Sequence, residues 1–212
     1  MWAYIKDNKI EQIYQRPKSL VLGEVRYPSN MFTKYTDAEK AAIGIYPVED
    51  NGTKGDDRFE NTSQATYTWS ASDKKVTTSY TITEKSLVDV EIKDESGNNI
   101  LDEKGNKTYT YGLKTQAKNL AKQQANSYIK QFNWLVERSI YDSSKAIPDA
   151  VKTYVAAIKT DCAEIETAID NASDIAAFKT LYQNTYNSDG TVNVIARINR
   201  WSDDYDVQQY VR

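Results

Sequence analysis

The spacing of apolar residues changes about halfway along the chain and separates a β-rich part from a helical part. From residue 112 to about 183, apolar residues recur every three or four positions, the period of an amphipathic helix. One stripe comprises Ala117, Ala121, Ala125, Tyr128, Phe132 and Leu135, and a second comprises Val151, Val155, Ile158, Cys162, Ile165 and Ile169. These stripes predict two long helices that pack as an antiparallel hairpin.

Local signals mark where the helices begin. Pro148 suits the first position of the second long helix, since its fixed φ is helical and its missing N–H has no partner there. A third helix is expected from Ser173, whose hydroxyl can cap it. Cys162 lies within the second stripe and is interpreted as a small buried apolar residue, because the chain has no histidine to activate it.

The first 110 residues favour short strands separated by turns. Strands over 2–6 and 9–14 flank Asp7-Asn8, a pair suited to a two-residue hairpin turn. A further strand is expected over 19–27, with Gly23 as a possible bulge. Three more are expected over 65–70, 75–83 and 87–93. Between these groups, Thr36 and Glu39 have the capping-box spacing of a short helix that ends at Gly44.

A near-repeat of eight residues follows, Asp94-Glu95-Ser96-Gly97-Asn98 and Asp102-Glu103-Lys104-Gly105-Asn106. An acidic loop with glycine raises the possibility of a calcium site. However, the ligand order of the known calcium loop, with its glutamate at position 12, is missing. Two hairpin turns around the apolar pair Ile100-Leu101 explain the pattern better.

The amino-acid composition excludes several kinds of catalytic and metal site. With no histidine and a single cysteine, the chain cannot build a Ser-His-Asp triad, a Cys-His dyad, a Cys/His zinc cluster or an intrachain disulfide. Phosphate-binding and dinucleotide-binding glycine motifs are also missing. We therefore expect no catalytic residue, no cofactor and no metal site, and the protein is predicted not to be an enzyme.

The net charge and the hydropathy of the chain limit the classes of partner that we expect. The net charge is -3, and the 27 basic residues alternate with 30 acidic ones along the chain. Nucleic-acid binders usually concentrate basic residues on one surface, so nucleic acid is not expected as a partner. No stretch approaches the roughly 20 apolar residues of a membrane helix, and residues 1–8 do not look like a cleaved signal peptide. Neither a membrane partner nor export is therefore expected.

The chain is rich in tyrosine, with 16, and several aromatic residues lie near its ends. Residues 187–212 form an acidic, aromatic segment with too few apolar residues to fold alone, so it must dock on its own helices or on a partner. Aromatic side chains are the usual anchors of protein interfaces. The candidate partner-binding residues are Trp2, Tyr4, Trp201, Tyr205 and Tyr210, whereas Trp134 is assigned to the core.

Two stretches resemble small tail proteins of tailed bacteriophages. The first runs through Tyr27-Pro28, Phe32, Tyr35-Thr36-x-x-Glu39 and Ala42-Ile43-Gly44-Ile45-Tyr46-Pro47-Val48. The second, Asn133-Trp134-Leu135-Val136-Glu137-Arg138 followed by Ile147-Pro148-Asp149-Ala150-Val151 and Tyr154, resembles the C-terminal helical part of tail assembly chaperones and tail-fibre-assembly proteins.

The resemblance implies a tail-associated virion protein, made in the host cytoplasm, that holds neighbouring tail proteins and is present as a homo-oligomer or in multiple copies. Two alternatives stay open: a fibre-assembly chaperone that leaves the particle, and a carbohydrate-binding module for receptor recognition. The expected fold class is α+β. We expect an antiparallel β-rich domain over 1–110 with one short helix, a helical domain over 111–186, and a C-terminal arm over 187–212.

Overall fold

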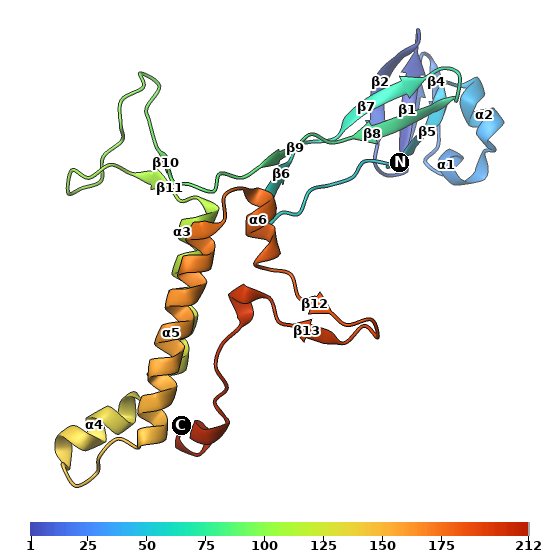
Figure 1. The fold of residues 1–212 in the computed structure, drawn as a ribbon. Helices are drawn as coiled ribbons and strands as arrows, with labels where there is room; N and C mark the ends of the chain where they lie inside the picture. Colours follow the sequence, from blue (N-terminus) through green and yellow to red (C-terminus); the bar gives the residue numbers. More distant parts are fainter. Residues whose placement is uncertain (212) are drawn as a thin grey trace. The chain divides into compact units, whose positions relative to one another are not determined.

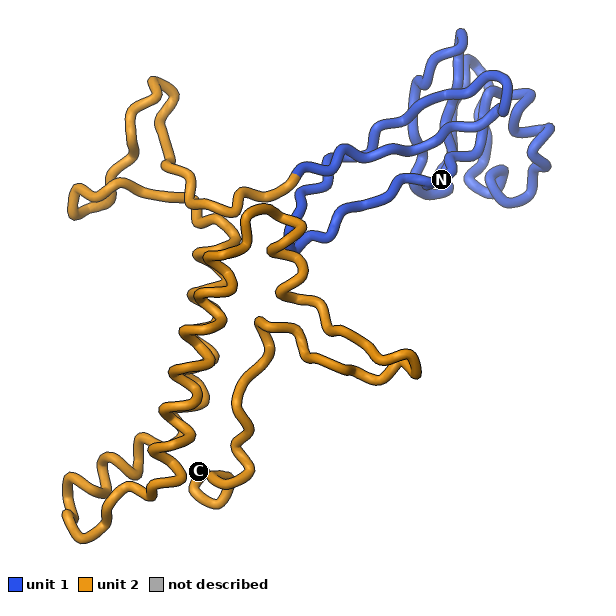
Figure 2. Tube along the Cα trace, in the orientation of Figure 1, with its two compact units in different colours: residues 1–83 blue, residues 84–212 orange. Residues whose placement is uncertain are grey.

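The computed structural model describes residues 1–211 and has a mixed α+β fold (Figure 1). It divides into two compact units, residues 1–83 and 84–212, which Figure 2 draws in different colours. The sequence pattern predicts a boundary near residue 110 instead. Residues 84–112 join the helical unit because the Leu113 amide donates to the Ser86 carbonyl at 2.9 Å and the Gly112 amide donates to the Asp89 carboxylate at 2.8 Å.

Unit 1 is built on a five-stranded sheet with the order β2-β1-β5-β8-β7. The strands are β1 (Trp2–Lys6), β2 (Lys9–Tyr14), β5 (Ile45–Glu49), β7 (Thr66–Ser70) and β8 (Lys75–Ser79). Most neighbours are antiparallel, as expected, but β5 and β8 pair in parallel, with Val48 opposite Val76. The long connection through residues 50–74 makes this possible, since parallel neighbours need a crossover of a dozen or more residues.

The first predicted hairpin is confirmed. Asp7 and Asn8 both have positive φ, 49° and 61°, as the turn between β1 and β2 requires. The expected single strand over 19–27 is instead a second hairpin, β3 (Leu20–Leu22) paired with β4 (Val25–Tyr27). Gly23, with φ of 63°, lies in its turn, so the bulge prediction was wrong.

Two short helices precede β5, where the sequence predicted one. The predicted helix is α2 (Asp37–Ala42), whose capping box is confirmed: the Glu39 amide donates to the Thr36 hydroxyl and the Thr36 amide donates to the Glu39 carboxylate. Gly44 follows with φ of 79°, and a Cβ there would lie 2.6 Å from the Ile5 carbonyl oxygen. The helix not predicted is α1 (Met31–Lys34), which buries Met31 and Phe32.

The predicted strands over 65–93 form only in part. The second is broken after Ser79, and its remainder is β9 (Ile82–Glu84), which pairs with β6 (Glu60–Thr62). The third shortens to β10 (Val90–Glu91), which pairs with β11 (Tyr109–Thr110). The imperfect alternation of these segments gives them no continuous apolar face to bury.

Unit 2 is organised by an antiparallel pair of long helices, α3 (Leu113–Lys130) and α5 (Asp149–Asn171). Ion pairs from Lys118 to Asp170 and from Lys122 to Glu166, together with a ring contact between Phe132 and Tyr154, fix their opposite directions. The predicted helical hairpin is therefore confirmed.

The ends of the helices differ from prediction in two places. The first predicted helix breaks at residues 131–132 and continues as a separate helix, α4 (Asn133–Tyr141). The third helix is α6 (Ile175–Thr180), and its cap is Asp174, whose carboxylate accepts the Ala177 amide at 2.8 Å, rather than Ser173. Asp is as good a cap as Ser, and sequence alone does not rank two adjacent candidates.

After α6 the chain forms a last hairpin and two 3-10 turns. The hairpin pairs β12 (Thr185–Tyr186) with β13 (Val192–Val194), and the turns are η1 (Arg197–Asn199) and η2 (Tyr205–Tyr210). The core of unit 2 contains Leu135, Tyr154, Ile158 and, from the last turn, Val207. Unit 1 has separate clusters on the two faces of β1.

Candidate interaction surfaces

Residues 84–111, which we call the first arm, carry apolar side chains that are not packed into any core. None of these residues, all of which the structure describes, is buried. In Figure 1 they form the excursion that precedes α3. The root of the arm is held tightly, because a Cβ at Gly112 would lie 2.4 Å from the Val88 carbonyl oxygen. The arm is therefore attached firmly to the helices but is otherwise exposed.

Three hairpin ends of the first arm meet around a closed ring of backbone hydrogen bonds. The Ile92 amide donates to the Thr108 carbonyl at 3.0 Å, the Ile100 amide to the Ile92 carbonyl at 2.9 Å, and the Thr108 amide to the Ile100 carbonyl at 2.9 Å. The three residues are eight positions apart, so the near-repeat in the sequence corresponds to a near-repeat in space. This arrangement leaves Ile100 and Leu101 outside, between the two turns.

The two turns of the near-repeat have the same internal bonds. Asp94 accepts the amides of Ser96 and Asn98 at 2.9 and 2.8 Å, and Asp102 accepts those of Lys104 and Asn106 at the same distances. These amides hold the pKa of both carboxyl groups below the usual value. The turn interpretation is confirmed. Within residues 1–211 no cluster of three or more Cys, Asp or Glu residues is placed to hold a metal ion.

The first arm exposes a row of large apolar side chains. They are Val88, Val90, Ile92, Ile100, Leu101, Tyr109 and Tyr111. Several large apolar side chains exposed to water on one segment favour a binding site there. An isolated two-stranded hairpin is also only marginally stable in water. The arm therefore exposes apolar surface and has little stability of its own.

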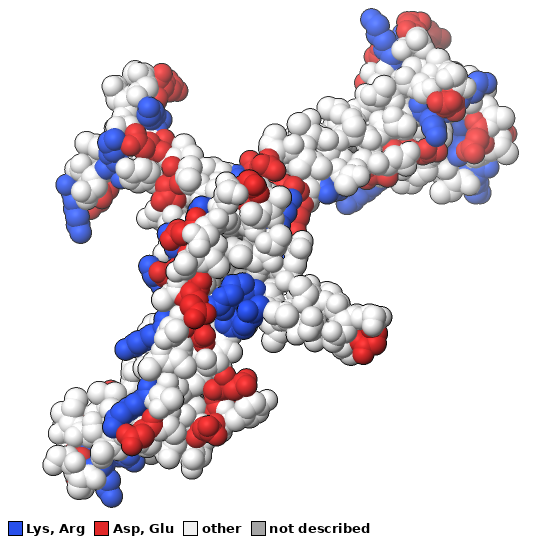
Figure 3. Space-filling model, viewed as in Figure 1, with Lys and Arg blue, Asp and Glu red and all other residues white. Residues whose placement is uncertain are grey.

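The β12–β13 hairpin, residues 184–195, forms a second exposed protrusion, which we call the second arm. All of residues 185–195 are exposed, including Tyr186, Val192, Val194 and Ile195. Asp189 is its only charged residue. Figure 3 shows this hairpin as an almost uncharged surface, whereas charges of both signs are interspersed over the helices and the first arm.

The C-terminal segment, residues 196–211, behaves differently and docks on the helices of its own unit. The Ser202 amide donates to the Asp161 carboxylate at 2.7 Å, and Arg197 pairs with Glu164 at 2.8 Å. Val207 is only 1% exposed. The Trp134 indole N–H donates to the Tyr210 carbonyl at 3.0 Å, which ties α4 to the end of the chain.

This docking buries Tyr154 under the segment. Desolvation, together with the nearby Asp204 carboxylate, raises the pKa of Tyr154 to about 12. The phenol therefore stays neutral in the folded unit well above the pH at which a free tyrosine ionises.

The five candidate anchors do not share one surface. Trp2 and Tyr4 lie in unit 1, and both pack against the same apolar cluster. The ring of Trp2 contacts that of Phe32, with centroids 4.7 Å apart. Trp201 and Tyr210 pack on the core of unit 2, as does the predicted core residue Trp134. Tyr205 alone is widely exposed, at 82%. Binding of a partner through these residues stays a prediction.

The sequence pattern does not predict the two arms as interaction surfaces. It predicts a strand for Val88, Val90 and Ile92, and two hairpin turns around Ile100-Leu101. The signal was present, since neither segment has enough alternating apolar residues to bury a face. The candidate anchors are Tyr and Trp residues near the chain ends, whereas the exposed apolar residues of the arms are mainly aliphatic.

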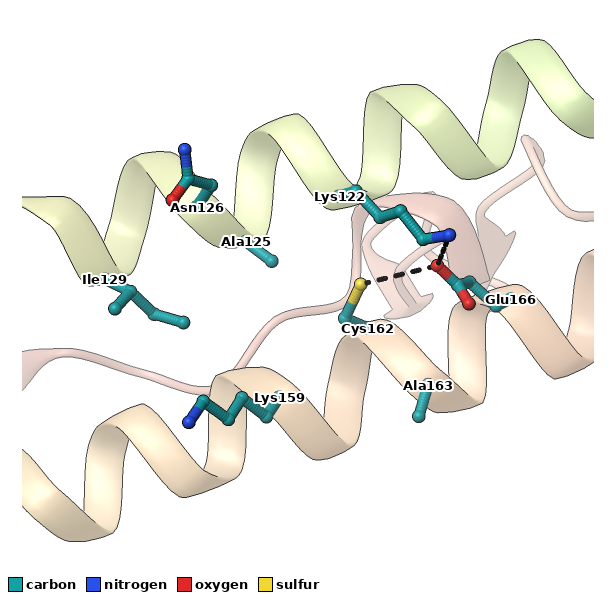
Figure 4. A pocket seen from close by; sticks show the side chains of 8 residues that line it. All are labelled: Lys122, Ala125, Asn126, Ile129, Lys159, Cys162, Ala163 and Glu166. Carbon is teal, nitrogen blue, oxygen red and sulfur yellow. Dashed lines mark hydrogen bonds and ion pairs between the residues drawn. The ribbon is translucent and has the colours of Figure 1, made fainter.

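One face of the α3–α5 pair carries an open groove, shown in Figure 4. It encloses about 350 Å³, and Ala125, Ile129 and Cys162 form its apolar floor, with Lys122, Lys159 and Glu166 at its edges. The groove continues past Ile129 into a second hollow of about 140 Å³ lined by Val136, Val151 and Val155.

Cys162 is half-buried in this groove, where it faces Glu166. The pKa of its thiol is raised, first by burial and then by the Glu166 carboxylate. A thiol in this state is a poor nucleophile, because the thiolate is the reactive form. Cys162 packs against the core of unit 2, as its place in the apolar stripe predicts, but it is half-buried rather than buried.

Comparison of the chain with protein families, with curated proteins and with solved structures found no match. Within residues 1–211, no helix combines the length and the hydropathy needed to cross a membrane.

Proposed function

We propose that this chain is a non-enzymatic structural protein of a tailed-phage virion, a tail-associated adaptor that holds neighbouring tail proteins. The observation that carries the proposal is the pair of exposed arms, residues 84–111 and 184–195, whose apolar side chains contribute to no core. The resemblance of residues 27–48 and 133–154 to small phage tail proteins supplies the setting.

The arms suit a role as connectors. Their short strands β10, β11, β12 and β13 leave backbone groups and alternate side chains available, and an added strand from a neighbour satisfies both at once. Burial of their aliphatic side chains supplies about 25 cal/mol for each Å² of apolar surface removed from water. A retained structural link needs such burial, because it must persist throughout the life of the particle.

Mass spectrometry of purified phage particles tests the proposal. We expect the protein at a fixed copy number relative to the other tail proteins. Detection in infected-cell lysate together with absence from purified particles would contradict the virion role and favour an assembly chaperone. Binding to a glycan array that is lost when exposed tyrosines are replaced would favour receptor recognition instead.

A matched pair of variants tests whether the first arm is needed for incorporation of the protein into particles. Leu101→Asp places a charge on the first arm, where the leucine is 55% exposed, and Val25→Asp places the same charge on the β3–β4 hairpin, where the valine is 53% exposed. We expect Leu101→Asp to reduce the copy number in particles and Val25→Asp to leave it unchanged. Equal incorporation of both variants would show that the first arm does not hold the neighbours.

A further inference from the structure

The open face of the α3–α5 pair and the first arm are complementary in polarity and charge, and both belong to unit 2. The groove offers an apolar floor, with a basic rim where Lys159 lies. The arm offers Leu101, which projects beside the acidic Asp102-Glu103 turn. We propose that the first arm of one copy inserts Leu101 into the α3–α5 groove of a second copy and pairs Glu103 with Lys159. This inference rests on the proposed function and names one of the neighbours that the adaptor holds.

The groove begins where the ionic contacts between the two helices end. Lys118 pairs with Asp170 at 2.8 Å and Lys122 pairs with Glu166 at 3.3 Å, so these pairs bridge α3 and α5 over one half of their length. One turn further along α3, Asn126 takes the place of a lysine, and the α5 residue on that side of the groove is Lys159. Figure 4 shows Asn126, Ile129 and Lys159 around the open part of the groove.

Lys159 and Glu103 are both available for such a pair. Both residues are exposed, and within residues 1–211 neither side chain makes a hydrogen bond or an ion pair. Asp102, by contrast, is engaged with the Lys104 and Asn106 amides of its own turn, which holds Glu103 beside it in a fixed loop. A preformed loop loses less conformational entropy on binding than a flexible one.

The net charge of the first arm also favours it as the occupant of the groove. Residues 84–111 hold seven acidic and four basic residues, which gives a net charge of -3 for the arm. The groove has two lysines and one glutamate at its edges, and that glutamate is already paired with Lys122. An acidic segment with an exposed aliphatic side chain therefore matches the groove in both polarity and charge.

The contact is not made within one chain. The arm is rooted at Gly112 at the start of α3, and the groove begins near Lys122, about 15 Å along the helix axis at 1.5 Å per residue. Leu101 stays exposed, and the groove stays open within one chain. Because arm and groove are different surfaces, a copy either exchanges arms with one partner in a closed dimer or receives one neighbour and reaches into another. The second, head-to-tail arrangement builds a ring or a filament.

The single cysteine of the chain provides a direct test on the full-length protein. In Leu101→Cys, oxidation with diamide at mildly alkaline pH, where more of the Cys162 thiol is ionised, should join the new thiol to Cys162 of the next copy. The product is a ladder of covalent species that starts at the dimer and extends to higher multimers in the head-to-tail arrangement. Val25→Cys introduces an equally exposed thiol in unit 1 and should give no ladder. Adding Cys162→Ser to the Leu101→Cys chain should abolish the ladder.

Charge reversal tests the ion pair independently. Lys159→Glu and Glu103→Lys should each slow cross-linking at least about tenfold, since like charges then face one another, and the chain with both changes should recover. All of these positions are on the surface, so circular dichroism should be unchanged. Loss of the ladder in the Leu101→Cys chain, or an intramolecular cross-link alone, would overturn the inference. Equal cross-linking by Val25→Cys, or failure of the double reversal to recover, would also overturn it. Presence in the particle is measured separately, so the adaptor proposal survives any of these results.

Discussion

The C-terminal segment and the first arm of unit 2 are both polar extensions with scattered apolar residues, yet they behave in opposite ways. The C-terminal segment places Val207 against the core and ties Ser202 and Tyr210 to the helices. The first arm buries none of its residues 84–111. The difference indicates that an extension docks on its own unit when a free apolar face lies within reach, and otherwise leaves its apolar side chains exposed.

The two faces of the α3–α5 pair explain why only one extension docks. The C-terminal segment covers Tyr154 and Tyr128, and Trp201 lies edge-on to Tyr128 with ring centroids 5.5 Å apart. The other face carries the groove at Ile129 and Cys162, and nothing in the described chain covers it. The first arm begins at the far end of α3 and does not reach that groove in its own chain.

Deletion of the C-terminal segment should have the largest effect on stability. Removing residues 201–212 exposes the core around Leu135, Tyr154 and Ile158, and we expect unit 2 to lose at least about 3 kcal/mol. Replacing residues 93–107 of the first arm by a short Gly-Ser linker should leave the stability nearly unchanged. Urea unfolding followed by far-UV circular dichroism measures both. Equal losses in the two variants would remove the distinction between docked and undocked extensions.

A smaller pair of substitutions makes the same comparison at single residues. Val207→Ala should cost about 1–3 kcal/mol, because the side chain is fully buried, whereas Leu101→Ala should change stability by less than about 0.5 kcal/mol. Thermal unfolding of the two variants measures the difference. If Leu101→Ala were the more destabilising of the two, the arm would have to be packed within the free chain.

Alkaline pH should loosen the docked segment. The pKa of Tyr154 rises from 10.0 to about 12 on folding, so the folded unit keeps a proton that the unfolded chain releases between these values. Its contribution to stability is complete below pH 10 and is lost as the pH rises toward 12. Urea unfolding at several alkaline pH values follows this loss. Tyr154→Phe should reduce the pH dependence, and an unchanged slope in that variant would assign the effect to other tyrosines.

Acid should have the smallest and most local effect, confined to the turns of the first arm. Backbone amides lower the pKa of Asp94 and Asp102 below their usual 3.8, so the turns keep their full stability above that pH and lose it as the pH falls through the lowered pKa. NMR of the Asn98 and Asn106 amides should show their bonds opening. Asp94→Asn keeps an acceptor that does not titrate, so Asn98 alone should become insensitive to pH.

Local signals in the sequence predicted much of the fold. The Asp7-Asn8 turn, the Thr36 capping box and the α3–α5 hairpin follow from turn chemistry, capping and helical period, and the structure has all three. Short-range rules did not reveal the parallel pairing of β5 with β8. That pairing depends on the path of a long connection, which no local pattern encodes.

Candidate interface residues were harder to predict because residue type does not reveal burial. Trp2 and Tyr4 look like anchors in the sequence, but they lie on the same face of β1 and pack on α1, while Ala3 and Ile5 fill the opposite face. The apolar residues of the first arm resemble ordinary strand residues. Only the three-dimensional structure shows that nothing in their own unit covers them.

Amide hydrogen exchange of residues 84–111, compared between the free protein and purified particles, tests most directly whether the arms bind neighbouring proteins. We expect fast exchange in the free chain and strong protection in the particle, with the buried amides of α5 protected in both. Equally fast exchange of the arm in both states would show that no partner covers it and would contradict the adaptor role.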